Sequence, residues 1–219
     1  IAGIRVAHST TGTVDLRVFN NAVSEITTAY TGTASTTKTV KGIFLSGTSG
    51  GLTNTYSVYN NSVSLDISSN LNASSVCLET ANSASIFVIR NNNFANFTSA
   101  QGLTAKHWGI AHTSTTSFGG TGTSVSNNNI YIPNDAGTSG YTAQGSSTNY
   151  NGVGTWQGSV PLATANLNPA VNPLFVNNTS DLHSGASALN GGGVAPPAYV
   201  TVDLDCAART PDNDIGAYI

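Results

Sequence analysis

The chain has few charged side chains, two cysteines and no methionine. Lys, Arg, Asp and Glu make up 8% of its 219 residues, against about 25% in an ordinary soluble domain. A net charge of −3 with seven scattered Lys and Arg leaves no electrostatic footprint for nucleic acid. Two cysteines are too few for a disulfide scaffold. The polar surface must therefore come from Ser, Thr, Asn and Gly, and we expect no nucleic-acid partner.

Long apolar runs are also missing. No stretch of 18 apolar residues occurs, so no membrane span is expected. A chain without Met, even at position 1, is expected to be a processed product or part of a longer protein, and the lack of a signal peptide fits a matured secreted protein. Cys77 lies in an apolar run and is expected to be a small buried hydrophobe. A bridge between Cys77 and Cys206 stays open.

An Asn-rich motif occurs four times within the same short apolar pattern. Counted from the first Asn, the copies are 40, 31 and 36 residues apart. Self-similarity on this scale indicates a chain that winds repeatedly past the same place. A sharp corner needs a left-handed residue, which Asn tolerates better than other non-Gly residues, and stacked amides can hydrogen-bond from repeat to repeat. The predicted structural corners are Asn20, Asn21, Asn60, Asn61, Asn91, Asn92, Asn127 and Asn128.

Short strand-like runs recur around these motifs, and no amphipathic helix of useful length is found. Three short strands per repeat, with a tight corner between two of them, predict an all-β parallel β-helix of roughly five to seven coils. The alternative is an antiparallel sandwich, but its hairpin pairs, Asn151-Gly152 and Asn190-Gly191, lie outside the repeats. The expected strands are Gly3–Ala7, Val14–Phe19, Gly42–Leu45, Tyr56–Tyr59, Ser62–Ile67, Ser75–Glu79, Ile86–Ile89, Trp108–Ala111, Ser124–Val125 and Ile130–Ile132.

One continuous domain in three parts is expected. Residues 1–133 are the coils with Asn-rich corners, 134–158 a loop excursion, and 159–219 the last coil or coils with a C-terminal cap. A solenoid needs such a cap because its last rung would otherwise expose core and unpaired backbone. The first residues begin in the middle of a coil, which predicts an open strand edge at the N-terminal end.

The C-terminal region carries a series of short motifs at Asn172–Val176, Asp181–His183, Ser187–Gly192, Val202–Asp205, Arg209, Pro211–Asp212 and Asp214–Tyr218. Through them, and over residues 42–219 as a whole, the chain resembles secreted bacterial right-handed β-helix proteins with a variable C-terminal anchoring or sorting signal. The likeness is in particular to giant cell-surface proteins exported by the type IX secretion route of Bacteroidota. The resemblance implies a right-handed β-helix, an extracellular or cell-surface location, and a structural or adhesive role in a surface adhesin, matrix or filament. It supplies no catalytic residues.

No catalytic signature is visible in the sequence. A polysaccharide lyase needs calcium ligands beside Lys or Arg, and a hydrolase needs converging carboxylates. The acidic residues before the tail are widely separated, so neither enzymatic activity nor a cofactor is expected, although distant residues can stack on one solenoid face. The alternative function is a glycan-binding module, or a polysaccharide lyase or hydrolase, on a β-helix scaffold. Trp156, in a predicted loop, is its candidate sugar contact, whereas Trp108 is expected to be buried.

One dense charged cluster occurs in the tail, at Asp203, Asp205, Arg209, Asp212 and Asp214. Hard oxygen ligands this close together can bind calcium. The interpretation that we favour is that Arg209 pairs with one or two of the carboxylates and pins the cap.

The remaining expectations concern histidines and partners. His107 and His112 are expected to be ordinary surface or loop residues rather than zinc ligands, because their spacing does not define a zinc site. The expected partners are copies of the chain or neighbouring modules of the same surface protein, docked at the open N-terminal edge by strand addition. Head-to-tail docking of copies would give an open filament.

Overall fold

The fold consists mostly of β-strands. The computed structural model describes residues 1–9, 13–28, 30, 32, 37–48, 54–67, 72–81, 85–98, 105–113, 123–133, 140–159, 170–209 and 213–218. In these ranges the chain forms strands, one α-helix and one short 3-10 helix. The expected all-β class is confirmed, and three of the sheets are built from parallel pairs.

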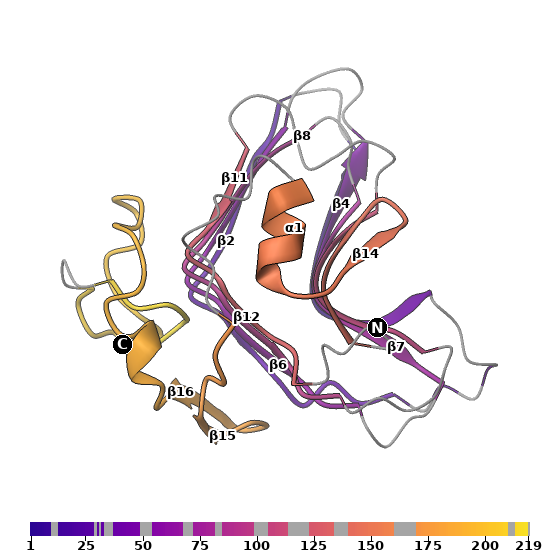
Figure 1. The fold of residues 1–219 in the computed structure, drawn as a ribbon. Coiled ribbons are helices and arrows are strands. Elements are labelled where there is room, and N and C mark those ends of the chain that lie inside the picture. The colour runs from indigo at the N-terminus through magenta and orange to yellow at the C-terminus, as the bar shows by residue number, and fades with distance from the viewer. Residues whose placement is uncertain are drawn as a thin grey trace.

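The chain passes through three parallel sheets in turn (Figure 1). Each of the first four repeats gives one strand to each sheet. Sheet A holds β1 (Ala2–Ser9), β4 (Lys38–Thr48), β7 (Ser74–Thr80), β10 (His107–His112) and β13 (Gly140–Gly145). Sheet B holds β2 (Asp15–Phe19), β5 (Asn54–Tyr59), β8 (Ser85–Arg90) and β11 (Ser124–Ser126). Sheet C holds β3 (Ala22–Val23), β6 (Ser62–Leu65), β9 (Asn93–Asn96) and β12 (Asn129–Tyr131).

The register between repeats places similar side chains above one another. Val18, Val58, Ile89 and Val125 are paired in sequence across sheet B, and all four are buried. In the same sheet Tyr56 pairs with Phe87 of β8, and the two rings stack with their centroids 5.3 Å apart. Because the strands are parallel and in register, like residues form continuous apolar columns. Every strand expected from the sequence overlaps an observed strand.

The winding ends earlier than expected. Four complete repeats and β13 are present in the described chain, rather than five to seven coils. The expected loop over 134–158 is wrong for residues 140–158, while 134–139 lie outside the described residues. Here β13 turns back into β14 (Thr148–Tyr150), which pairs antiparallel with it and is followed by α1 (Val153–Ser159). An antiparallel partner on β13 ends the parallel succession in sheet A.

Helix α1 covers the end of the core, and the C-terminal segment does not. In Figure 1, α1 lies across the space enclosed by the sheets, and the yellow C-terminal segment lies outside them, beside the corner between sheets B and C. Trp156 of α1 is 0% exposed and belongs to the interior core. The expectation that the tail caps the last coil is therefore wrong, because a tryptophan-bearing helix already fills that position. The segment contains β15 (Phe175–Asn177), β16 (Asp181–Ser184) and a 3-10 helix at Ser187–Leu189.

None of the helical segments described has the length and apolar character that crossing a membrane requires.

Replacing Trp156 by Ala is expected to lower the free energy of unfolding by about 3–5 kcal/mol, because the lost indole leaves a cavity at the end of the core. Val176→Ala is the control, since this side chain is 72% exposed, and a change within about 0.5 kcal/mol is expected for it. Urea unfolding followed by circular dichroism measures both. Similar small effects for the two variants would contradict the covering role of α1.

Candidate functional site

Each repeat turns from sheet B to sheet C through one left-handed residue. Asn20, Asn60, Asn91 and Asn127 have φ values of 53°, 52°, 58° and 55°. Asn is the residue best suited to this conformation after Gly, because its short side chain can hydrogen-bond locally. The first Asn of every motif thus lies at the corner, as the motif predicts.

The second Asn of every motif points inward and forms a continuous amide ladder. The Nδ2 groups of Asn21, Asn61 and Asn92 each donate to the Oδ1 of the Asn in the next repeat at 2.8 Å, and the ladder ends at Asn128. The backbone N–H of each donor residue reaches the same oxygen at 3.0–3.1 Å. Asn61, Asn92 and Asn128 are completely buried, so the ladder satisfies polar groups that burial would otherwise penalise.

The corner Asn side chains point the other way and hold the C-terminal segment. Asn60 Nδ2 donates to Asp214 O at 3.2 Å, and Asn127 Nδ2 donates to Gly192 O at 3.1 Å. Asn91 makes a reciprocal pair, donating to Val194 O at 2.7 Å and accepting from Val194 N–H at 2.9 Å. In the first repeat Asn20 Nδ2 donates to Val202 O. The segment therefore runs along the whole corner column and is bonded to every repeat.

Arg209 fastens the tail to the first repeat. Its NH2 group donates to Asn20 Oδ1 and to the carbonyl oxygens of Gly216 and Ala217 at 3.0–3.1 Å. Burial lowers the pKa of Arg209, and the nearby carboxylates of Asp203 and Asp214 oppose this shift. Among the described residues, Arg209 pins the tail through carbonyl and amide oxygens, and no ion pair with Asp203, Asp205 or Asp214 is present.

The acidic cluster does not converge on one point. Asp203 Oδ1 accepts from Ala207 N–H and Asp214 Oδ1 accepts from Gly191 N–H, both at 2.7 Å. Asp205 Oδ2 bonds to the ring of His183, and Asp212 lies outside the described residues. Within the described ranges no three His, Cys, Asp or Glu side chains come together in a way that could hold a metal. These contacts give no support to a calcium site, since Asp203 and Asp214 order backbone turns.

His183 joins two parts of the tail through its ring nitrogens. Nδ1 lies 2.5 Å from Asp181 Oδ1, Nε2 lies 2.6 Å from Asp205 Oδ2, and the ring stacks on Tyr218 at 4.0 Å. Both nitrogens can donate only in the imidazolium form. The hydrogen bond to Asp181, followed by that to Asp205, raises the pKa of His183, and the same bond lowers the pKa of Asp181.

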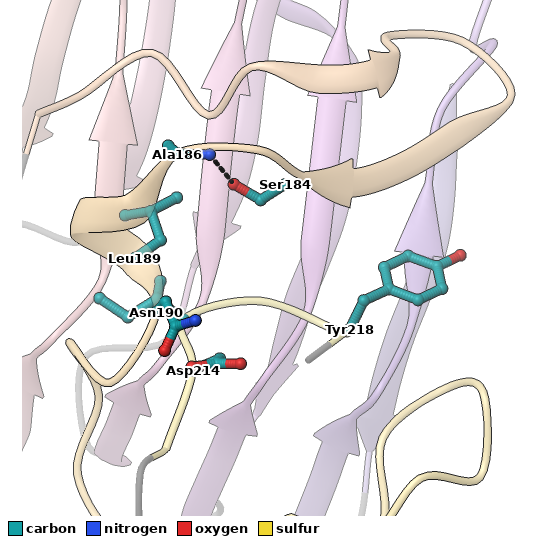
Figure 2. Close-up of a pocket in the computed structure, with 7 residues that line it drawn as sticks. Ser184, Ala186, Leu189, Asn190, Asp214 and Tyr218 are labelled. Carbon is teal, nitrogen blue, oxygen red and sulfur yellow. Dashed lines mark hydrogen bonds between the residues drawn. The ribbon is translucent and has the colours of Figure 1, made fainter.

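A small pocket lies between the segment that begins at the end of β16 and residues 214–218 (Figure 2). Its volume is about 170 Å³, below the roughly 300–1,000 Å³ typical of ligand sites. Ser184 Oγ donates to Pro173 O at 2.6 Å and accepts from Ala186 N–H, so the polar atoms of its rim serve the local fold. The lining residues are Ser184, Ala186, Leu189, Asn190, Asp214, Ile215 and Tyr218.

One cleft does bring two carboxylates together. Glu25 and Asp66, from different repeats, line a hollow of about 320 Å³ with Asn178 and Thr179 of the tail. Among the other described carboxylates, Asp15 pairs with Arg17 at 2.7 Å. Residues widely separated in sequence thus meet on one face here, as a solenoid allows.

The aromatic and sulfur residues singled out by sequence are mostly interior. Trp156 is buried in α1, so the expected contact between its ring and a sugar is wrong. Trp108 is 0% exposed, as predicted. Cys77 is buried, which confirms that expectation, and burial raises the pKa of its thiol; Cys206 is exposed and both thiols are free.

His107 and His112 lie inside strand β10 rather than on the surface, which corrects the expectation for them. Both are 0% exposed, and they bond to Ser75 Oγ at 2.9 Å and Thr80 Oγ1 at 2.8 Å on the neighbouring strand. Burial, assisted by Lys106, lowers the pKa of His107 to about 4. Strand alternation could not have placed both inside, because residues five apart fall on opposite faces of a strand and every residue of β10 is buried.

The first repeat lies at the end of the winding opposite α1. β1, β2 and β3 are the outermost strands of sheets A, B and C. Ile4 and Val6 are only partly buried, whereas their register partners Ile43 and Leu45 are 0% and 1% exposed. A cleft of about 490 Å³ opens beside Ile4, at the first Asn corner.

Replacing Asn92 by Ala is expected to lower the free energy of unfolding by about 2–3 kcal/mol, because its neighbours in the ladder lose their buried partner. Asn178→Ala, at an exposed position, is the matched control and is expected to be close to neutral. Equilibrium urea unfolding compares them. Equal stabilities would mean that the ladder does not hold the repeats together.

Two histidines are expected to titrate on opposite sides of the usual value of about 6.5. The anchoring by His183 is complete below that value and is lost as pH rises through its raised folded pKa. His107 is buried in its neutral form, because its folded pKa is lowered to about 4. It therefore contributes stability above pH 6.5 that is lost as pH falls towards 4. NMR titration of the ring protons measures both; midpoints in the reverse order would contradict the two environments.

Comparison with protein-family models, with curated proteins and with solved structures finds no match for this chain. The likeness to surface β-helix proteins therefore remains one of sequence motifs, and the function proposed below rests on these motifs together with the geometry.

Proposed function

We propose that the chain is a right-handed parallel β-helix module with an extracellular structural or adhesive role, and that its first repeat is an edge for docking. The succession of sheets A, B and C in every repeat supports the winding. The low charge and the buried amide ladder suit a scaffold that stacks repeats. The single observation that carries docking is the exposed edge of all three sheets at β1, β2 and β3.

The proposed occupant of this edge is another β-helical unit, from a second copy or from a neighbouring module. Unpaired backbone groups along an edge strand are a template for strand addition. Asn21 Oδ1, at the end of the ladder, can accept from a donor amide of a neighbouring module, as Asn61 Oδ1 accepts from Asn21. A second copy joined by the same edge presents the same acceptor, so between copies the contact would come from the strand edges and not from the ladder.

Contact between copies would join two N-terminal edges. The other end of each copy is covered by α1 and by antiparallel β14. This cover disfavours the head-to-tail filament that the sequence suggested. Such a filament would need an open strand edge at the β13 end, where β14 already pairs with β13. An edge-to-edge pair uses the same surface on both copies and closes as a dimer.

A second candidate function, a polysaccharide-active enzyme, has one observation in its favour. Glu25 and Asp66 line the same cleft, and hydrolases need two carboxylates flanking the scissile bond. Loss of polysaccharide cleavage in Asp66→Asn would support this alternative, whereas absence of any cleavage by the intact chain would remove it.

Placing a charge at the edge is expected to prevent docking. Val6→Lys should weaken association of copies at least tenfold, about 1.4 kcal/mol, because the ammonium would enter the apolar contact. Val176→Lys, at a position 72% exposed in the tail, is the control. Sedimentation velocity over a range of concentrations measures the effect, and hydrogen exchange follows the β1 amides. A monomer whose β1 amides are as protected as those of β7 would contradict an open edge.

A further inference from the structure

Four of the seven Lys and Arg residues of the chain gather on sheet A. Arg5 lies on β1, Lys38 and Lys41 on β4, and Lys106 directly before β10. The face that these four share with the rings of Phe44, Trp108 and Tyr141 is called the cationic face below.

The strand register shows that this face is the outer side of the sheet. Lys41, Val76, Trp108 and Tyr141 are paired in turn across β4, β7, β10 and β13. Val76, Trp108 and Tyr141 belong, with Ala111, to an apolar cluster separate from the interior core. Side chains of one column in a parallel sheet stand on the same face, so the column points away from the core.

Each lysine is held against an aromatic ring. Lys41 Nζ lies 3.8 Å from the centroid of Phe44, and Lys38 Nζ lies 4.6 Å from that of Trp108. Lys106 Nζ lies 5.4 Å from the centroid of Tyr141 and donates to its hydroxyl at 3.3 Å. Cation–π contacts fix the ammonium groups without neutralising them. The charges are therefore positioned before any ligand arrives.

The positive charge of the face exceeds its negative charge. Glu79, which pairs with Lys41 at 2.5 Å, is the only carboxylate in the strands of sheet A. Four cations less one carboxylate leave +3 here, in a chain whose net charge is −3. Burial lowers the pKa of Lys38, Glu79 opposes this shift, and Lys41 adds to it. An anion placed beside these ammonium groups would favour their charged form.

We propose that the cationic face binds an acidic polysaccharide, a chain of sugar rings carrying carboxylate or sulfate groups. Four inter-strand steps of about 4.8 Å separate β1 from β13, so the face spans about 19 Å, which suits a polymer rather than a single anion. A hollow of about 240 Å³ lined by Arg5, Lys41 and Phe44 lies at one end. At the other end Gln144 is partly exposed; its Oε1 accepts from Lys38 Nζ and its Nε2 donates to Asn149 Oδ1 at 3.1 Å, so it holds Lys38 in place.

Nucleic acid fits this face less well. Binding of single strands relies on aromatic rings that stack on bases, but Trp108 is 0% and Tyr141 7% exposed. The face therefore offers ammonium groups rather than exposed rings, and carboxylate or sulfate groups on a sugar chain can pair with them.

This inference deepens the adhesive role proposed above and can fail separately from the docking edge. The edge depends on inward-facing Ile4 and Val6, whereas the cationic face uses outward-facing side chains. Val6→Lys is accordingly expected to retain polysaccharide binding, and neutralising the face is expected to leave association of copies unchanged.

Binding is tested by isothermal titration with polygalacturonate and with heparin as probes, and with dextran as the uncharged control. The expected result is binding of one or both acidic polymers, weakened by added salt, and none of dextran. The two acidic probes distinguish carboxylate from sulfate recognition. No binding of either at low salt overturns the proposal, as does tighter binding of duplex DNA or of vesicles containing anionic lipid.

A charge-matched pair of variants tests the location. Arg5→Gln with Lys106→Gln removes two cations from the face without touching the Lys41–Glu79 pair, and about tenfold weaker binding is expected. Arg17→Gln with Arg90→Gln changes the net charge equally at sheet B and is expected to bind like the unaltered chain. Equal weakening in both overturns the assignment. Thermal melting checks folding, and the exposed single variant Arg5→Gln replaces the pair if the double variant unfolds.

Discussion

A left-handed corner followed by a buried amide is the constraint on which the structure depends. At each passage from sheet B to sheet C the first Asn of the motif has a positive φ, and the second turns its side chain inward. The inward amides bond only if successive corners lie directly above one another. That requirement sets the register of the flanking strands, and with it the apolar columns of Val58 and Ile89. Local backbone chemistry and long-range stacking are thus satisfied by the same two residues.

The outward side of the same corners determines where the C-terminal segment lies. The corner Asn side chains lie outside the ladder and bond to the backbone of the C-terminal segment. Because the segment contacts every repeat from Asn127 back to Asn20, it links the last repeat to the first. Separation of neighbouring repeats would break these contacts together. A laterally bound tail therefore adds cohesion that stacking between neighbours alone does not supply.

The two ends of the winding differ, and this difference shapes the proposed function. Trp156 and β14 close one end, while Ile4 and Val6 leave the other incompletely covered. Among the described residues, the cover provided by α1 and β14 has no counterpart beside β1, β2 and β3. On the outer side of sheet A, the fixed lysines form a surface of opposite sign to the whole chain. The proposed docking edge and the proposed polysaccharide site thus use different surfaces of one scaffold.

The sequence by itself determined the repeats, because strand alternation and the left-handed preference of Asn are local properties. It therefore predicted the strands, the Asn corners and the burial of Cys77 and Trp108. The tail position, the interior place of Trp156 and the cationic face were decided only by tertiary structure. Asn91 and Val194, for example, are 103 residues apart in the chain. No local pattern encodes such a contact, because it exists only after the winding has placed four corners in one column and four distant cations on one sheet.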